Sequence, residues 1–355
     1  MSESSADSHI RALADGIAEV HISSAEAGEM ARLVWEHVIG PVPRQVDYRE
    51  TGAHFRLAEL SGSILPERVR AALAGLREGA LDAVVVHGLP ADPLDDHRPP
   101  DESHNGHGGI GGDARSAQPQ PLLGWTWLGM VTRQLGHEYG YRAEKGGNLV
   151  HDVRPRPDGA ATQSNASSEV DLQLHTEVAF HEIRPDFVLL YGVRSPQPRP
   201  ATRLVRIADA VGECSPETVR RLREPRFRIC APDSFSLGGA AVDGVRPIGG
   251  TPGWPTIRWH SSIAGDDPAD KAAIMEFRAA AERVAHRVRL APGSLLAFSN
   301  SRCLHGRDAF EAHYDGRDRW LLRTYVLRDI TRLMSRYGPP AGDGAIRRLA
   351  ETRIA

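Results

Sequence analysis

The chain has 355 residues and a formal net charge of −3 at neutral pH. This near balance argues against a nucleic-acid partner or an acidic membrane surface, and no apolar run reaches membrane-spanning length. The three cysteines form neither a disulfide framework nor a zinc signature, and the first residues do not resemble a signal peptide. We therefore expect a soluble cytoplasmic protein, with its oligomeric state left open.

Four helices are predicted from the spacing of apolar residues and from signals at their N-termini. They cover residues 24–39, a segment opened by Pro66, residues 122–135, and a segment that begins at Asp267-Pro268 and keeps an apolar face as far as Val288. The first is preceded by a capping-box pattern of Ser23 and Glu26.

Short strands separated by turns dominate the chain from about residue 147 onward. The clearest predicted strands are residues 82–87, 186–192, 201–207, 294–298 and 319–328. The strands do not alternate regularly with helices, which favours a mainly β or α+β jelly roll, a double-stranded β-helix flanked by helices, over a doubly wound sheet. We expect a single domain with an N-terminal region over 20–140, a core over 147–330 and a loosely held tail over 331–355.

Residues 91–120 are rich in proline, glycine, aspartate and histidine, which predicts a mobile insertion. The run from Gly106 to Gly111 matches a dinucleotide-binding fingerprint by letter, but it lacks the strand before it and the helix after it that such a site needs. Histidines 97, 104 and 107 are interpreted as solvated loop residues. This insertion and the segment 233–250 are both candidates for a lid over a binding site.

The most informative pattern is a His-x-Glu sequence, His175 and Glu177, followed 128 residues later by His305. The preceding residues 170–174 alternate apolar and polar side chains, which indicates an extended segment. His175 and Glu177 would then point to one face and Thr176 to the other. Two imidazoles and one carboxylate make the facial set of ligands that suits non-haem Fe(II).

Two arginines strengthen this interpretation. Arg319 follows His305 by 14 residues, and Arg323 lies four residues further along the same predicted strand. Both therefore share a face with Leu321 and Tyr325, about 13 Å apart at ~3.3 Å per residue. Arginines that point into a barrel need anions, and arginine is well suited to binding carboxylates. The alternative is a strand face that is either exposed at the surface or salt-bridged within the protein.

With these residues assembled, the chain resembles the clavaminate synthase-like family of Fe(II)/2-oxoglutarate-dependent oxygenases, in particular the branch that hydroxylates free amino acids such as arginine. The matching segments are Asn148–Val153, Leu174–Phe180, Arg184–Leu190, His305–Phe310 and Tyr314–Leu321. The similarity extends from about residue 80 to about residue 330.

The resemblance implies an iron site at His175, Glu177 and His305, with 2-oxoglutarate and O2 as co-substrates. Arg319 would bind the distal carboxylate of 2-oxoglutarate. Thr202 would assist it, although the neighbouring Arg203 leaves the register of that strand open.

The resemblance also implies a set of substrate contacts. Arg323 would bind the substrate carboxylate and Glu144 the substrate amine, while the remaining contacts would come from Ser164, Asn165, Asp233 and His260. The strand that carries acidic residues in the arginine hydroxylases has none here over residues 256–262, so a substrate with a basic or polar side chain is expected rather than arginine specifically.

Three alternatives remain at this point. The chain could hydroxylate side chains of a peptide or protein, which a polar groove would favour over a closed pocket. It could catalyse desaturation or ring closure, which share the same chemistry. It could also be a non-catalytic metal-binding barrel that senses a ligand, an interpretation that Arg319 disfavours.

Overall fold

The computed structural model describes residues 10–40, 62–93, 121–232, 235, 240–338 and 349–350. The dinucleotide-like run at 106–111, histidines 97, 104 and 107, and most of the predicted insertion lie outside the described residues. So do Asp233 and part of the segment 233–250. No helix among the described residues is long and apolar enough to span a membrane.

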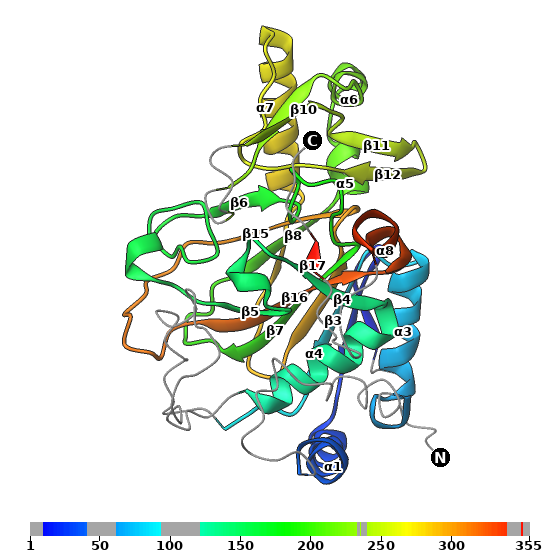
Figure 1. The fold of residues 1–355 in the computed structure, drawn as a ribbon, viewed down its shortest axis with the longest axis vertical. Coiled ribbons are helices and arrows are strands. Elements are labelled where there is room, and N and C mark those ends of the chain that lie inside the picture. Colours follow the sequence, from blue (N-terminus) through cyan, green and yellow to red (C-terminus); the bar gives the residue numbers. More distant parts are fainter. Residues whose placement is uncertain are drawn as a thin grey trace, which may run out of the picture.

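A large mixed sheet runs through the molecule (Figure 1). In order across the sheet its strands are β1 (Ile10–Ala14), β2 (Ile17–His21), β3 (Ala83–His87), β14 (Leu295–Ser299), β7 (Phe187–Arg194), β16 (Trp320–Leu327), β4 (His137–Tyr141) and β17 (Leu349–Ala350). A further strand, β5 (Val150–Val153), also pairs with β16. The pairs β2–β3 and β4–β17 are parallel, and the other described pairs are antiparallel.

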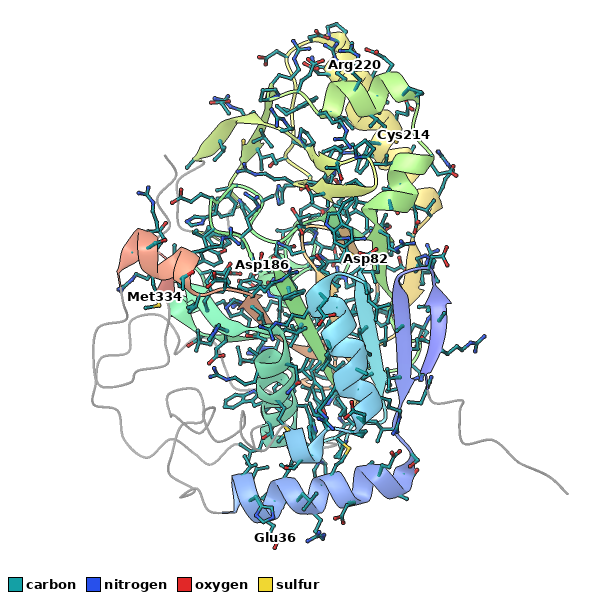
Figure 2. All side chains as sticks on the ribbon, turned by 90° about the vertical axis from the view of Figure 1, so that its right-hand side faces the viewer. Glu36, Asp82, Asp186, Cys214, Arg220 and Met334 are labelled. Carbon is teal, nitrogen blue, oxygen red and sulfur yellow. The ribbon has the colours of Figure 1, made fainter. Side chains whose placement is uncertain are left out.

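A smaller antiparallel sheet supplies the other wall of the core. Its strands are, in order, β13 (His286–Val288), β8 (Thr202–Arg206), β15 (Cys303–Arg307) and β6 (Leu172–His175). Two hairpins, β9 (Phe227–Cys230) with β10 (Ala241–Val245) and β11 (Ile248–Thr251) with β12 (Trp254–Ile257), lie near the helices α5 (Ile207–Gly212), α6 (Pro216–Leu222) and α7 (Pro268–Arg283) at one end of the molecule. In Figure 2, Cys214 and Arg220 mark this end of the molecule, and Glu36 marks the opposite end.

The two faces of the large sheet carry separate hydrophobic cores because side chains alternate along each strand. One face, with Val84 and Leu189, packs with the helices α1 (Ser24–Val34), α3 (Glu67–Glu78) and α4 (Leu122–Leu135). The other face, with Leu190, shares a core with Leu204 and Leu304 of the smaller sheet. The second core therefore lies between the two sheets.

The predicted helices are present, with two differences in extent. The capping box of Ser23 and Glu26 forms as expected, but the α-helix ends at Val34 and continues as a π-helical turn, η1 (Trp35–Ile39). Apolar spacing predicts a helix but not its hydrogen-bond register, and the wider turn buries both Val38 and Ile39. The helix α7 ends at Arg283, so Val288 belongs to strand β13 instead.

The five predicted strands are also present, each within two residues of its expected ends. The prediction missed β1, β2 and β4, the short helices α5 and α6, and α8 (Thr331–Tyr337), which lies in the segment expected to be a loosely held tail. These elements are only five to seven residues long, too short for periodicity to separate them from loops.

Candidate active site

The structure brings His175, Glu177 and His305 together. His175 ends β6 and pairs directly with His305 of β15, while Glu177 follows two residues later. Each residue offers one ligand atom, and these atoms lie within 4.8 Å of one another. His305 Nε2 lies 3.4 Å from Glu177 Oε1. The extended segment and the strand pairing therefore produce the three-residue cluster that the sequence predicts.

A clamp of hydrogen bonds fixes the backbone at Glu177. Its N–H donates to Asn300 Oδ1 at 2.8 Å, and Asn300 Nδ2 donates back to the carbonyl of Glu177 at 3.1 Å. The next residue, Val178, has a positive φ of 54°, an uncommon conformation for a β-branched residue. The chain therefore turns sharply away directly after the carboxylate.

The surroundings of His175 prepare it to act as a metal ligand. Its Nδ1 donates to the backbone carbonyl of Gln173 at 2.8 Å, which leaves Nε2 as the nitrogen with a free lone pair. Burial and the neighbouring His305 lower the pKa of His175 to about 3. The imidazole is therefore neutral at physiological pH, as a metal ligand must be.

Arg319 lies in the same pocket. It is buried, and its Nη2 donates to Thr202 Oγ1 at 3.3 Å. Among the described residues, no carboxylate forms an ion pair or hydrogen bond with Arg319. Burial and the neighbouring Arg307 lower the pKa of Arg319 to about 9. A buried guanidinium in this state is a binding site for an anion.

The register of β8 decides between Thr202 and Arg203. Thr202 faces Arg319, whereas the guanidinium of Arg203 forms ion pairs with Glu282 and Asp308 and donates to the carbonyl of Leu172. Neighbouring residues of a strand point to opposite faces, so only one of the two can reach the pocket.

The resemblance implies that Arg323 binds the substrate carboxylate, but in this structure both of its Nη groups donate to side chains of the protein. Nη1 donates to Glu177 Oε1 and Nη2 donates to Glu144 Oε1, each at 2.7 Å. Nη2 also lies 2.9 Å from His151 Nδ1. Burial is the largest single effect on the pKa of Glu177 and would raise it, but Arg323, His305 and His175 together outweigh burial and hold the pKa well below its ordinary range.

Tyr325 completes this network. Its hydroxyl lies 3.2 Å from Glu144 Oε1 and 3.2 Å from Glu177 Oε2, so it joins the two carboxylates. The second oxygen of Glu144, Oε2, is buried and has no hydrogen-bond partner in the described structure. Burial raises the pKa of Glu144 even though Arg323 opposes the shift. An unsatisfied buried carboxylate oxygen is a site for a hydrogen-bond donor such as an ammonium group.

One pocket contains nearly all of the predicted site residues. Its lining includes His175, Glu177, His305, Arg319, Thr202, Arg323, Glu144, Ser164, Asn165 and His260. Its walls come from both sheets and from the segment 163–165. Asp233 lies outside the described residues, although its neighbours Pro232 and Phe235 line the pocket.

Arg307 lines the same pocket and was not predicted as a site residue. Its Nη2 donates to Ser167 Oγ at 2.8 Å and to the carbonyl of Val170 at 3.1 Å, and its Nη1 donates to the carbonyl of Ser167. These bonds tie the loop that carries Ser164 and Asn165 to the strand that carries His305. The partners are a hydroxyl and backbone carbonyls far away in sequence, so no pattern in the sequence indicated this role.

Comparisons with known proteins agree with this geometry. Residues 242–325 match the model of the taurine catabolism dioxygenase TauD, TfdA family. L-asparagine oxygenase of Streptomyces coelicolor is 37% identical over 273 residues, which are 75% of this chain and 78% of the relative. Clavaminate synthase 2 of Streptomyces clavuligerus is 31% identical over 294 residues, 79% of this chain and 84% of the relative.

Two solved structures are also similar over nearly their whole lengths. Asparagine oxygenase in complex with Fe(II), (2S,3S)-3-hydroxyasparagine and succinate has a TM-score of 0.80 and 28% identity, covering 94% of this chain and 99% of that structure. The non-haem iron oxygenase OrfP in complex with Fe and alpha-ketoglutaric acid has a TM-score of 0.76 and 25% identity, with the same coverage.

Proposed function

We propose that this chain, which belongs to the clavaminate synthase-like family of Fe(II)/2-oxoglutarate-dependent oxygenases, hydroxylates an unactivated C–H bond of a free amino acid with a basic or polar side chain. Like its relatives, it is a non-haem iron enzyme that uses Fe(II), 2-oxoglutarate and O2. The observation that carries the proposal is a buried Arg319 that has no counter-ion among the described residues and shares a pocket with His175, Glu177 and His305.

The three clustered residues fit Fe(II). Two neutral imidazoles and one carboxylate would occupy one face of an octahedral ion and leave the opposite face open. Bound there, iron would supply the oxidising power that removes hydrogen from carbon and delivers oxygen to it. The protein's part is to hold His175 in the correct tautomer through Gln173 and to fix Glu177 through Asn300.

Arg319 and Thr202 would bind the distal carboxylate of 2-oxoglutarate. The carboxylate would supply the negative charge that balances the Arg319 guanidinium. Thr202 would contribute a hydroxyl that already contacts this guanidinium. The buried pair therefore offers a charged and directional site for the far end of the co-substrate.

Arg323 and Glu144 would hold the two charged groups common to all free amino acids. The unpartnered Oε2 of Glu144 would accept a hydrogen bond from the substrate ammonium. The substrate carboxylate would compete for Arg323, so the bond from Nη1 to Glu177 Oε1 would have to lengthen or break as the substrate enters. Substrate entry would thereby change the charge around Glu177, which is also a proposed iron ligand.

The rest of the pocket would determine which side chain is accepted. Ser164, Asn165 and His260 provide neutral polar groups, and His260 Nδ1 lies 2.7 Å from Ser262 Oγ. Burial lowers the pKa of His260, which therefore adds no positive charge near neutrality. These groups support a polar side chain, while Asp233 would favour a basic one if it closes over the pocket.

Several broader expectations belong to the same proposal. The pairing of a large and a small sheet around one core supports the predicted jelly roll. A single domain, a cytoplasmic location, a role in specialised metabolism and His175, Glu177 and His305 as the iron ligands also stay predictions.

The proposal is tested by succinate release. Purified protein supplied with Fe(II), ascorbate and 2-oxoglutarate should release succinate when the correct amino acid is added, and a mass-spectrometric screen of free amino acids should find a product 16 Da heavier. A product 2 Da lighter would instead indicate desaturation or ring closure. His175→Ala should abolish turnover, and coupled turnover in that variant would contradict the ligand assignment. His313→Ala, which changes an exposed histidine, is the matched control.

A further inference from the structure

A second cluster of two histidines and a glutamate lies on two neighbouring strands of the large sheet, β2 and β3. Glu19 and His21 are two residues apart on β2, so both point to the same face. His87 ends the neighbouring parallel strand β3, directly in register with His21. One ligand atom from each residue lies within 4.8 Å of the others.

Both ring nitrogens of His87 in this cluster already have a neighbouring oxygen atom. His87 Nε2 lies 3.5 Å from Glu19 Oε1, and His87 Nδ1 lies 3.3 Å from Ser294 Oγ. A hydrogen bond to the second ring nitrogen is typical of metal-binding histidines because it fixes the ring and the tautomer. Glu19 and His87 are half-buried and His21 is exposed, so solvent can reach the cluster.

The present geometry of the rings is not the metal-bound geometry. The rings of His21 and His87 are stacked, with centroids 4.8 Å apart and an interplanar angle of 20°. Lone pairs of nearly parallel rings do not converge, and donors at ~2.1 Å from a tetrahedral ion lie about 3.4 Å apart. Rotation of the exposed His21 would bring the nitrogens together without moving either strand.

We propose that Glu19, His21 and His87 form a second metal site, which binds a divalent transition ion of the zinc type and joins β2 to β3. Two imidazoles and one carboxylate suit Zn2+, and water would complete its coordination. The site would link β2 to β3 near this edge of the sheet; Figure 2 shows β1 and β2 in blue and β3 in cyan.

This site is independent of the proposed iron centre. Its residues come from β2 and β3 of the large sheet, whereas His175 and His305 come from β6 and β15 of the smaller sheet. Each site can therefore be removed by mutation while the other stays intact. This separation lets the second site be tested even if the proposed function is wrong.

The test is equilibrium dialysis against Zn2+ in a His175→Ala background, followed by measurement of the metal-to-protein ratio. Adding His21→Ala should remove one equivalent of Zn2+. Adding Glu19→Gln, which keeps the size of the side chain, should weaken binding of that equivalent roughly tenfold or more. Zn2+ should also raise the melting temperature of the background protein but not that of the His21→Ala protein.

His313→Ala is again the control, because His313 is an exposed histidine outside the cluster. Equal Zn2+ content with and without His21 would overturn the proposal, as would an equal loss of Zn2+ in the His313 variant. Circular dichroism of the Glu19→Gln protein without metal should match that of the background, which separates loss of a ligand from loss of fold.

Discussion

Arg319 and Arg323 occupy similar positions along the chain but opposite electrostatic states. Arg319 directly precedes the strand and Arg323 lies within it, and both are buried and line the same pocket. Arg323 is bonded to two carboxylates, Glu144 and Glu177. The hydrogen bond of Arg319 goes to the neutral hydroxyl of Thr202.

The pKa values of Arg319 and Arg323 reflect this difference in their partners. Burial lowers the pKa of Arg319 to about 9, since no anion opposes it. Burial acts on Arg323 as well, but the carboxylates of Glu177 and Glu144 outweigh it and raise the pKa above the ordinary value. Within the described part of the chain, one arginine is therefore neutralised by carboxylates of the protein, and we propose that the other is neutralised by a ligand. We infer that Arg323 supports the folded state and the substrate, whereas Arg319 serves chiefly the co-substrate.

The largest expected difference between the two arginines is in stability. Arg323→Met would leave Glu144 and Glu177 buried close together without a cation, so unfolding in urea at neutral pH should show a loss of about 3–5 kcal/mol. The double variant Arg323→Met with Glu144→Gln should recover part of this lost free energy of unfolding. Arg319→Met removes an uncompensated charge and should leave the metal-free protein as stable as before or more stable. Equal losses in the two variants would contradict the comparison.

The same Arg319→Met variant should fail in catalysis. Truncating one partner of a buried charge pair costs about 2–5 kcal/mol, so kcat/KM for 2-oxoglutarate should fall by roughly 30- to 4,000-fold. Initial rates at varied 2-oxoglutarate give this ratio, and Fe(II) binding measured separately should stay unchanged. A variant that loses iron rather than co-substrate affinity would place Arg319 in a different role.

The pH dependence of co-substrate binding should sharpen the comparison further. With its pKa lowered to about 9, Arg319 is charged below that pH and loses its charge above it. The dissociation constant of 2-oxoglutarate should therefore be nearly constant between pH 7 and 8 and then rise toward tenfold for each pH unit above about 9. Anaerobic titration at each pH measures this constant, with metal affinity followed in parallel. A constant affinity up to pH 10.5 would show that Arg319 keeps an ordinary pKa.

The sequence alone predicted those parts of the site that follow from the alternation of side chains between the two faces of a strand. His175 and Glu177 on an extended segment, and Arg319 and Arg323 four residues apart on one strand, were placed on common faces by geometry alone. The ligand pattern, together with the resemblance to a known family, predicted that the distant His305 would join them, and the pairing of β6 with β15 brings it there.

The parts that the sequence did not indicate depend on contacts between distant residues. Tyr325 was correctly placed on the face of the arginines, but its hydroxyl bonds to Glu144 and Glu177 come from strand packing. The occupied state of Arg323 was missed for the same reason. Thr202 and Arg203 could not be separated because a shift of one residue in β8 exchanges the two faces.

The smallest predicted effect concerns Thr202, whose place in the pocket depends on the register of β8. Thr202→Val keeps the shape of the side chain but removes the hydroxyl that contacts Arg319 Nη2 at 3.3 Å. A hydrogen bond to a charged group contributes about 1.5–3 kcal/mol, and this long bond belongs at the lower end, so KM for 2-oxoglutarate should rise roughly tenfold while kcat changes little. Arg203→Lys is the matched control, because Arg203 points to the opposite face and pairs with Glu282. If Arg203→Lys raised KM for 2-oxoglutarate more than Thr202→Val did, the assigned register of β8 against the pocket would be wrong.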